Sequence, residues 1–179
     1  MVTKSLLQAI AVTAELTQTE LSEAAARVMA DDLSRYPESQ VLAALTKCRK
    51  QLKGRLSIAD VISRLDDGRP DAEEAWSAVA KALNDEGVTL VTTDEMMQAF
   101  GVACGLPDDP IAARMAFKES YARLVAEARD KRTPIAWTAS LGHDAGGREG
   151  PLLEAVEKGR LPAPYVAKLL PHRDEQINA

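Results

Sequence analysis

The sequence is poor in several residue types that define common classes of protein. Aromatic residues make up only 4% of the 179 residues, so a core must come mainly from Ala, Leu, Val and Ile. Cys48 and Cys104 are the only cysteines, too few for a disulfide framework or a structural zinc site. We expect both to be buried free thiols in a reducing compartment.

Long apolar runs are also missing. No segment approaches the roughly 18 apolar residues of a membrane span, and residues 1–16 lack the apolar region of a signal peptide. We therefore expect a cytoplasmic protein without membrane contact. The net charge of −5 is unlike that of a dedicated nucleic-acid binder, although a local basic patch can exist on an acidic protein.

No catalytic motif is present. The glycine-rich stretch 142–150 lacks the order of a phosphate loop, and there is no nucleophile elbow. His143 and Asp144 form a His-Asp pair, but His172 is the only other histidine, and a metal site needs more ligands. The surrounding glycines favour a turn in which Asp144 bonds the backbone. We expect no enzymatic activity, no metal and no cofactor.

What the sequence does contain is helical periodicity, beginning with residues 1–68. Apolar residues there recur at a helical spacing in four segments, and alanine favours helices. Thr17 to Glu20 resembles a capping box, and Ser57 with Asp60 resembles another helix start. Residues 1–68 are therefore predicted to form a four-helix N-terminal unit.

The rest of the chain is expected to be helical and then irregular. Residues 70–133 are predicted to form a second helical segment, packed on or linked to the first, with Pro110 at a helix start. The β-like run at 88–91 is too short and isolated to found a sheet. Residues 134–179, rich in Gly and Pro, are predicted to be a flexible C-terminal arm. The predicted fold is all-α: small helical bundles with this arm.

The candidate binding residues are five cations within a stretch that has no acid, followed by one tryptophan. The cations are Lys47, Arg49, Lys50, Lys53 and Arg55. They are suited to phosphates or to an acidic protein patch. The alternative is that cations lie here because the macrodipole favours them at a helix C-terminus.

Trp137 lies in the predicted arm, where a large aromatic residue has little reason to be unless it docks on something. It is a candidate anchor for a partner. Packing onto its own domain is an equally good interpretation.

The stretch LSEAAARVMADDLSRYPESQVLAALTKCRKQLKGRLSIADVISRLDDG, residues 21–68, resembles the N-terminal helical domain of the phage-encoded loader and inhibitor of replicative helicases. The resemblance lies in a helix, a polar break, a second helix with a basic end, and a short helix led by Ser57. The stretches TDEM and SLGHD are similar to stretches of small phage or prophage proteins.

The resemblance implies an all-helical, non-enzymatic adaptor that binds a ring-shaped replicative helicase and passes it to single-stranded DNA. In that family a disordered C-terminal part engages the helicase or an initiator protein. This chain departs from the pattern by a further helical segment at 93–130. The alternative is a small DNA-binding or regulatory helical protein that binds single-stranded or duplex DNA through the basic patch at 47–69. The sequence leaves the oligomeric state open.

Overall fold

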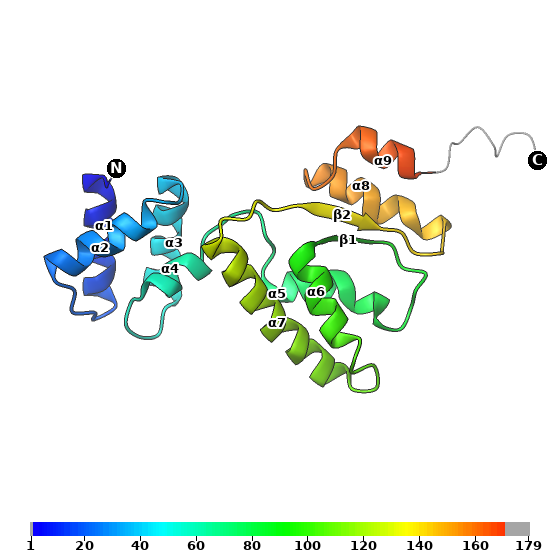
Figure 1. The fold of residues 1–179 in the computed structure, drawn as a ribbon, viewed down its shortest axis with the longest axis horizontal. Helices are drawn as coiled ribbons and strands as arrows, with labels where there is room; N and C mark the ends of the chain where they lie inside the picture. The colour runs from blue at the N-terminus through cyan, green and yellow to red at the C-terminus, as the bar shows by residue number, and fades with distance from the viewer. Residues whose placement is uncertain (1, 171–179) are drawn as a thin grey trace, which may run out of the picture. The chain divides into compact units, whose positions relative to one another are not determined.

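The computed structural model describes residues 2–170, which are mostly helical with one small sheet (Figure 1). The chain divides into two compact units, residues 1–68 and residues 69–179, called unit 1 and unit 2 below. Each unit has its own hydrophobic core.

Unit 1 is built from four helices. They are α1 (Lys4–Leu16), α2 (Glu23–Leu33), α3 (Glu38–Gln51) and α4 (Ile58–Ser63). Its core consists of aliphatic side chains, methionine and one cysteine, with Ile10, Leu33, Leu45 and Val61 completely buried. The core residues of each longer helix lie three or four positions apart, as Leu6, Ile10 and Ala14 do in α1. Each of these helices therefore turns one apolar face inward.

The helix ends of unit 1 follow local capping chemistry. Ser57 begins α4 with the expected capping box, because its hydroxyl accepts from the Asp60 N–H while Asp60 accepts from the Ser57 N–H. The capping box predicted at Thr17 to Glu20 is wrong. Thr17 instead ends α1, and Ser22 begins α2 by accepting from the N–H of Ala25.

Unit 2 contains more kinds of element. In chain order they are α5 (Ala72–Val79), η1 (Ala80–Leu83), β1 (Leu90–Thr93), α6 (Asp94–Ala103), α7 (Pro110–Asp130), β2 (Trp137–Ser140), η2 (Gly146–Arg148), α8 (Glu149–Glu157) and α9 (Ala163–Leu169). Pro110 is the first residue of α7 as predicted, with Asp109 as the N-cap.

The all-α prediction is corrected by the antiparallel pairing of β1 with β2, which makes the fold mainly helical. Leu90 lies opposite Ser140, and Thr93 lies opposite Trp137. Leu90 packs into the core formed with α5, α6 and α7, whereas Val91 packs against α8 and α9. The two strands therefore lie between two layers of helices (Figure 1). This cover supplies the stability that a two-stranded ribbon lacks alone.

The predicted flexible arm is also corrected. Within 134–170 the chain forms β2, η2, α8 and α9, which belong to the same unit as residues 70–133. Leu152 and Val166 are buried in a cluster with Leu161. This hydrophobic cluster, together with pairing to β1, gives the stretch its structure despite its glycines and prolines. The remaining residues of the predicted arm, His172 among them, lie outside the described residues.

Unit 2 encloses a buried ion pair. The guanidinium of Arg69 donates to the Glu95 carboxylate, with Nη2 2.9 Å from Oε1, and to the Thr133 carbonyl oxygen at 2.9 Å. Burial acts to raise the pKa of Glu95, but hydrogen bonds from Thr93 and Arg69 outweigh it and hold that pKa below its ordinary value. The pair thus joins the start of unit 2 to α6 and to the chain after α7.

Candidate interaction surface

The five predicted cations lie together in unit 1, at the end of α3 and in the connection to α4. We call them the basic strip: Lys47, Arg49, Lys50, Lys53 and Arg55. All but Arg49 are exposed. The stretch from Lys47 to Ile58 contains no acidic residue, so the strip is a local cationic surface on a protein with a negative net charge.

The connection that carries Lys53 and Arg55 is fixed at both ends. Leu52 is half-buried against the unit 1 core, and Leu56 is 8% exposed. The N–H of Leu56 donates to the hydroxyl of Thr19 at 2.7 Å. Gly54 has a φ of 149°, a backbone conformation that favours glycine, and it turns the chain between these two leucines. The two cations therefore project from an anchored turn.

Arg49 has a different environment from the other four cations. Its guanidinium donates to the hydroxyl of Thr13 on α1 at 2.9 Å and to that of Thr46 at 2.8 Å. Thr13 is fully buried. Arg49 therefore links α3 to α1. Its guanidinium is engaged in these two hydrogen bonds, unlike the side chains of the four exposed cations.

Helix electrostatics account for only part of the strip. Arg49 and Lys50 lie in the last turn of α3, where the macrodipole favours cations. Lys47 lies before that turn, and Lys53 and Arg55 lie beyond the helix. Within residues 2–170, the ion pairs of acidic residues are made with other cations, such as Glu23 with Arg27. The free charge of the strip is available to an external anion.

Trp137 lies in unit 2, so it is not part of the basic strip. As the first residue of β2 it is half-buried between the two hydrophobic clusters that cover the sheet. The guanidinium carbon of Arg160 lies 4.3 Å from its ring centroid, a cation–π contact. The structure thus gives Trp137 intramolecular packing, which was the alternative to an anchor for a partner.

The His143 and Asp144 region forms a turn, as predicted from its glycines. Asp144 Oδ1 accepts from the N–H of Gly146 at 3.0 Å, and Gly142 lies against the backbone of Gly87. In the part of the chain described, no group of three or more His, Cys, Asp or Glu side chains is placed to hold a metal ion.

The two cysteines differ in exposure. Cys48 is fully buried in unit 1, its thiol donates to the Asp60 carbonyl oxygen at 3.6 Å, and burial raises the pKa of that thiol. Cys104 is exposed at the end of α6, so the prediction that both are buried is wrong for Cys104.

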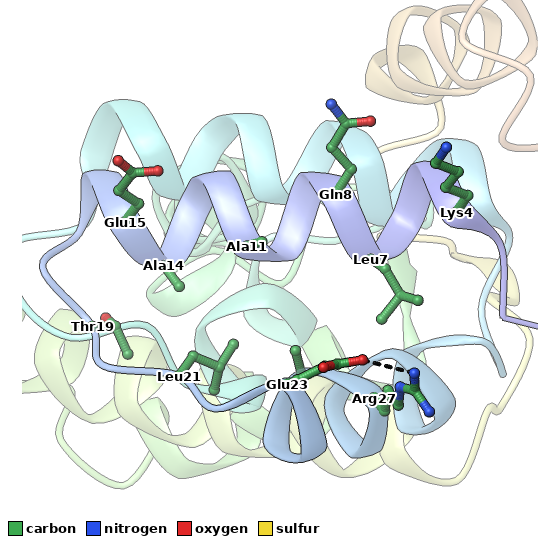
Figure 2. A pocket seen from close by; sticks show the side chains of 11 residues that line it. Lys4, Leu7, Gln8, Ala11, Ala14, Glu15, Thr19, Leu21, Glu23 and Arg27 are labelled. Carbon is green, nitrogen blue, oxygen red and sulfur yellow. Dashed lines mark hydrogen bonds and ion pairs between the residues drawn. The ribbon is translucent and has the colours of Figure 1, made fainter.

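Two grooves were not apparent from the sequence. In unit 1, a groove of about 870 Å³ lies between α1 and α2 (Figure 2). Its apolar lining comes from the side chains of Leu7, Ala11, Ala14, Leu21 and Ala26. The sequence signal for this groove was the pair of small residues Ala11 and Ala14 on one face of α1, and such a pair also occurs in helices that simply face water.

In unit 2, a groove of about 660 Å³ lies between η1 and the start of α7. It is lined in part by Trp76, Ile111 and Met115. Ile111 is 78% exposed and Met115 62% exposed, one helical turn apart. Exposed apolar side chains that gather beside a groove are typical of a binding surface for protein.

Comparison with known proteins gives no relative: no family model, curated protein or solved structure matches this chain. None of the helices in residues 2–170 combines the length and the apolar character needed to cross a membrane.

Proposed function

We propose that this protein is a non-enzymatic adaptor of DNA replication that binds a replicative helicase, as the resemblance of residues 21–68 to phage helicase loaders implies. The observation that carries the proposal is the basic strip, four of whose cations are exposed at fixed positions. An adaptor that passes a helicase to single-stranded DNA needs a surface for phosphates, and anchored cations provide one.

A second surface supports an adaptor over a simple DNA-binding module. The groove beside Ile111 and Met115 has a mainly apolar lining, although Arg114 and Lys118 also line it. The basic strip is cationic, so the two surfaces suit partners of different chemistry. We assign the helicase contact to the groove of unit 2, because apolar side chains at the centre of a contact supply most of its affinity. We assign single-stranded DNA to the basic strip.

The test uses full-length protein with substitutions, because cutting the chain after Thr133 would remove β2 from its pairing with β1. One variant carries I111D and M115D in the groove of unit 2. A second carries K47A, K50A, K53A and R55A in the basic strip. The control for the first is V28D, since Val28 on α2 is 62% exposed like Met115. The control for the second is R27A with R35A, exposed cations of unit 1 that pair with Glu23 and Asp32.

Each protein is immobilised and mixed with host lysate, and then with the purified replicative helicase. We expect the wild type, the strip variant and both controls to retain the helicase, and the I111D/M115D variant to lose it. Retention by every variant would place the contact elsewhere on the chain. Absence of the helicase from the wild-type sample would overturn the adaptor proposal.

The alternative function is a small DNA-binding or regulatory protein that uses the patch at 47–69. It is favoured by the same exposed cations, and DNA binding is measured separately by anisotropy of a labelled single strand and a labelled duplex. Binding to single strands should weaken with salt, with a slope of roughly 0.7 per phosphate contact, and the strip variant should lose most of that slope. DNA binding without helicase retention would favour this alternative. No binding at low salt would remove the DNA role from both proposals.

A further inference from the structure

The groove of unit 1 has an ordered arrangement of charge along α1. Lys4, Gln8, Ala11 and Glu15 lie three or four residues apart, so they share one face of the helix. Lys4 lies at one end of the groove and Glu15 at the other, with the uncharged residues Leu7, Gln8, Ala11 and Ala14 between them (Figure 2). Neither Lys4 nor Glu15 takes part in an ion pair among the contacts of the described residues. The face therefore begins with a positive charge and ends with a negative one.

The opposite wall of the groove adds one cation, whose charge is balanced by Glu23 in the same wall. Arg27 of α2 lies at the same end as Lys4 (Figure 2). Although Arg27 pairs with Glu23 at 2.7 Å, both side chains are largely exposed, so the guanidinium can also meet a second carboxylate. An incoming helix should therefore carry an acid at the Lys4 end and a base at the Glu15 end.

The reverse of α1 satisfies this requirement. When two copies of a helix run antiparallel about a two-fold axis, every contact between one residue and another occurs twice. Lys4 of each copy then meets Glu15 of the other, while Leu7 and Ala11 meet at the centre. The groove and the helix that fills it are then parts of the same sequence, so the second copy itself supplies both matching charges.

We propose that a second copy of this chain seats its α1 antiparallel in the groove, which makes the protein a homodimer through unit 1. The small side chains of Ala11, Ala14 and Ala26 let the two helices approach closely, because interaxial distance depends on side-chain size at the contact. The dimer also covers Leu7 and Leu21, which are half-buried in the single chain. The inference is independent of the proposed function, since it uses neither the basic strip nor unit 2.

The test is charge reversal in the full-length protein. The variants are K4E, E15K and the double variant K4E/E15K, and the matched controls are K53E and E20K. Lys53 and Glu20 are exposed and do not line the groove. Circular dichroism with thermal unfolding establishes that every variant is folded. Sedimentation equilibrium, from low micromolar to submillimolar protein, gives the dimer dissociation constant.

We expect the wild type and both controls to dimerise. K4E or E15K alone places like charges at both symmetric contacts, so each should raise the dissociation constant about tenfold or more. K4E/E15K exchanges the two charges and should restore the wild-type value. A mixture of K4E with E15K should form a heterodimer in preference to either homodimer, because every contact is then attractive, and native mass spectrometry distinguishes the three species.

Three results would overturn the proposal. The wild type could remain monomeric throughout the concentration range, as it would if the groove instead binds a helix of another protein. Dimers of K4E and E15K could be as stable as those of K53E and E20K, which would place the interface elsewhere. The single variants could be weakened while neither the double variant nor the mixture recovers, which would exclude the antiparallel arrangement.

Discussion

Unit 1 and unit 2 differ in the residues that build them and in the kinds of contact that hold their elements together. Residues 1–68 contain one aromatic residue, Tyr36, and nine Lys and Arg against nine Asp and Glu, so the acidic excess lies in residues 69–179. Unit 1 begins α4 with a cap made by near neighbours, and hydrogen bonds such as that from Arg49 to Thr13, 36 residues apart, join its helices. Unit 2 stacks aromatic rings, buries an ion pair between residues 26 apart, and pairs strands separated by α6 and α7.

The comparison teaches which kind of structure a single sequence reveals. Signals such as Ser57 with Asp60 act within one turn of chain, so they can be read from the letters alone. Contacts such as the pairing of β1 with β2 depend on the position in space of a segment that is far away in the sequence. We therefore expect the largest effects from changes that remove contacts between residues far apart in the sequence, and the smallest from changes that remove a local cap.

The largest effect is expected for Phe117→Ala in unit 2. Phe117 is fully buried, with its ring centroid 5.3 Å from that of Trp76 and 5.7 Å from that of Tyr121. Truncation leaves a cavity and should lower the free energy of unfolding of unit 2 by about 4 kcal/mol.

Denaturant titration followed by residue-resolved NMR measures the two units separately. The matched change is Leu45→Ala, also fully buried, which should cost unit 1 about 3 kcal/mol. Equal losses in both units from Phe117→Ala would show that the two units unfold as one.

The next largest effect is expected at the buried ion pair. Glu95→Ala leaves Arg69 buried without its carboxylate and should cost about 3 kcal/mol. The pKa of Glu95 is lowered in the folded state, so its contribution is fully present above the unfolded pKa of about 4.3. It is lost as the pH falls through the folded pKa.

Thermal unfolding between neutral and acid pH checks the sign of this linkage. Glu95→Gln should flatten the acid side of the stability curve, whereas Glu119→Gln, an exposed carboxylate of α7, should leave it unchanged. An acid limb that is as steep in Glu95→Gln as in the wild type would rule out this role for the pair.

A smaller effect, with opposite signs at two sites, is expected for glycine to alanine changes in unit 2. A Cβ on Gly142 would lie 1.9 Å from the carbonyl oxygen of Gly87. Gly142→Ala must therefore push apart two loops that are far apart in the sequence but in contact, at a cost of about 2 kcal/mol. Gly101 lies exposed within α6 with open space around its Cβ position, and Gly101→Ala should stabilise the protein by roughly 0.5 to 1 kcal/mol. Calorimetry gives the change in stability for each variant. Destabilisation by both would contradict the explanation that the close approach of Gly142 to Gly87 is the cause.

The smallest effect is expected for Ser57→Ala in unit 1. The substitution removes the N-cap of α4 and should cost about 1 kcal/mol. Ser39→Ala within α3, where the serine is exposed, is the matched control and should have little effect. Because the cap also positions the connection that carries Lys53 and Arg55, anisotropy on DNA measures whether the basic strip depends on it.

The sequence predicted helices within residues 1–133, because helical periodicity, Ser57 and Pro110 act locally, but it placed α8 and α9 in a flexible arm. It missed β2, since Trp137 to Ser140 is too short to stand out among glycines and gains its structure from β1. It also missed the Arg69–Glu95 pair, as no spacing rule links positions so far apart. The inward contact of Arg49 with Thr13 was hidden for the same reason, and so was the groove between α1 and α2.

Both tryptophans, Trp76 and Trp137, belong to unit 2, so the emission of indole reports on one half of the protein alone. Unit 1 gives no tryptophan emission in such an experiment, although its helices contribute to the circular dichroism signal. An unfolding curve recorded by fluorescence and one recorded by circular dichroism therefore follow different parts of the chain. The separation between the two curves measures, without any label or substitution, how far the units depend on each other.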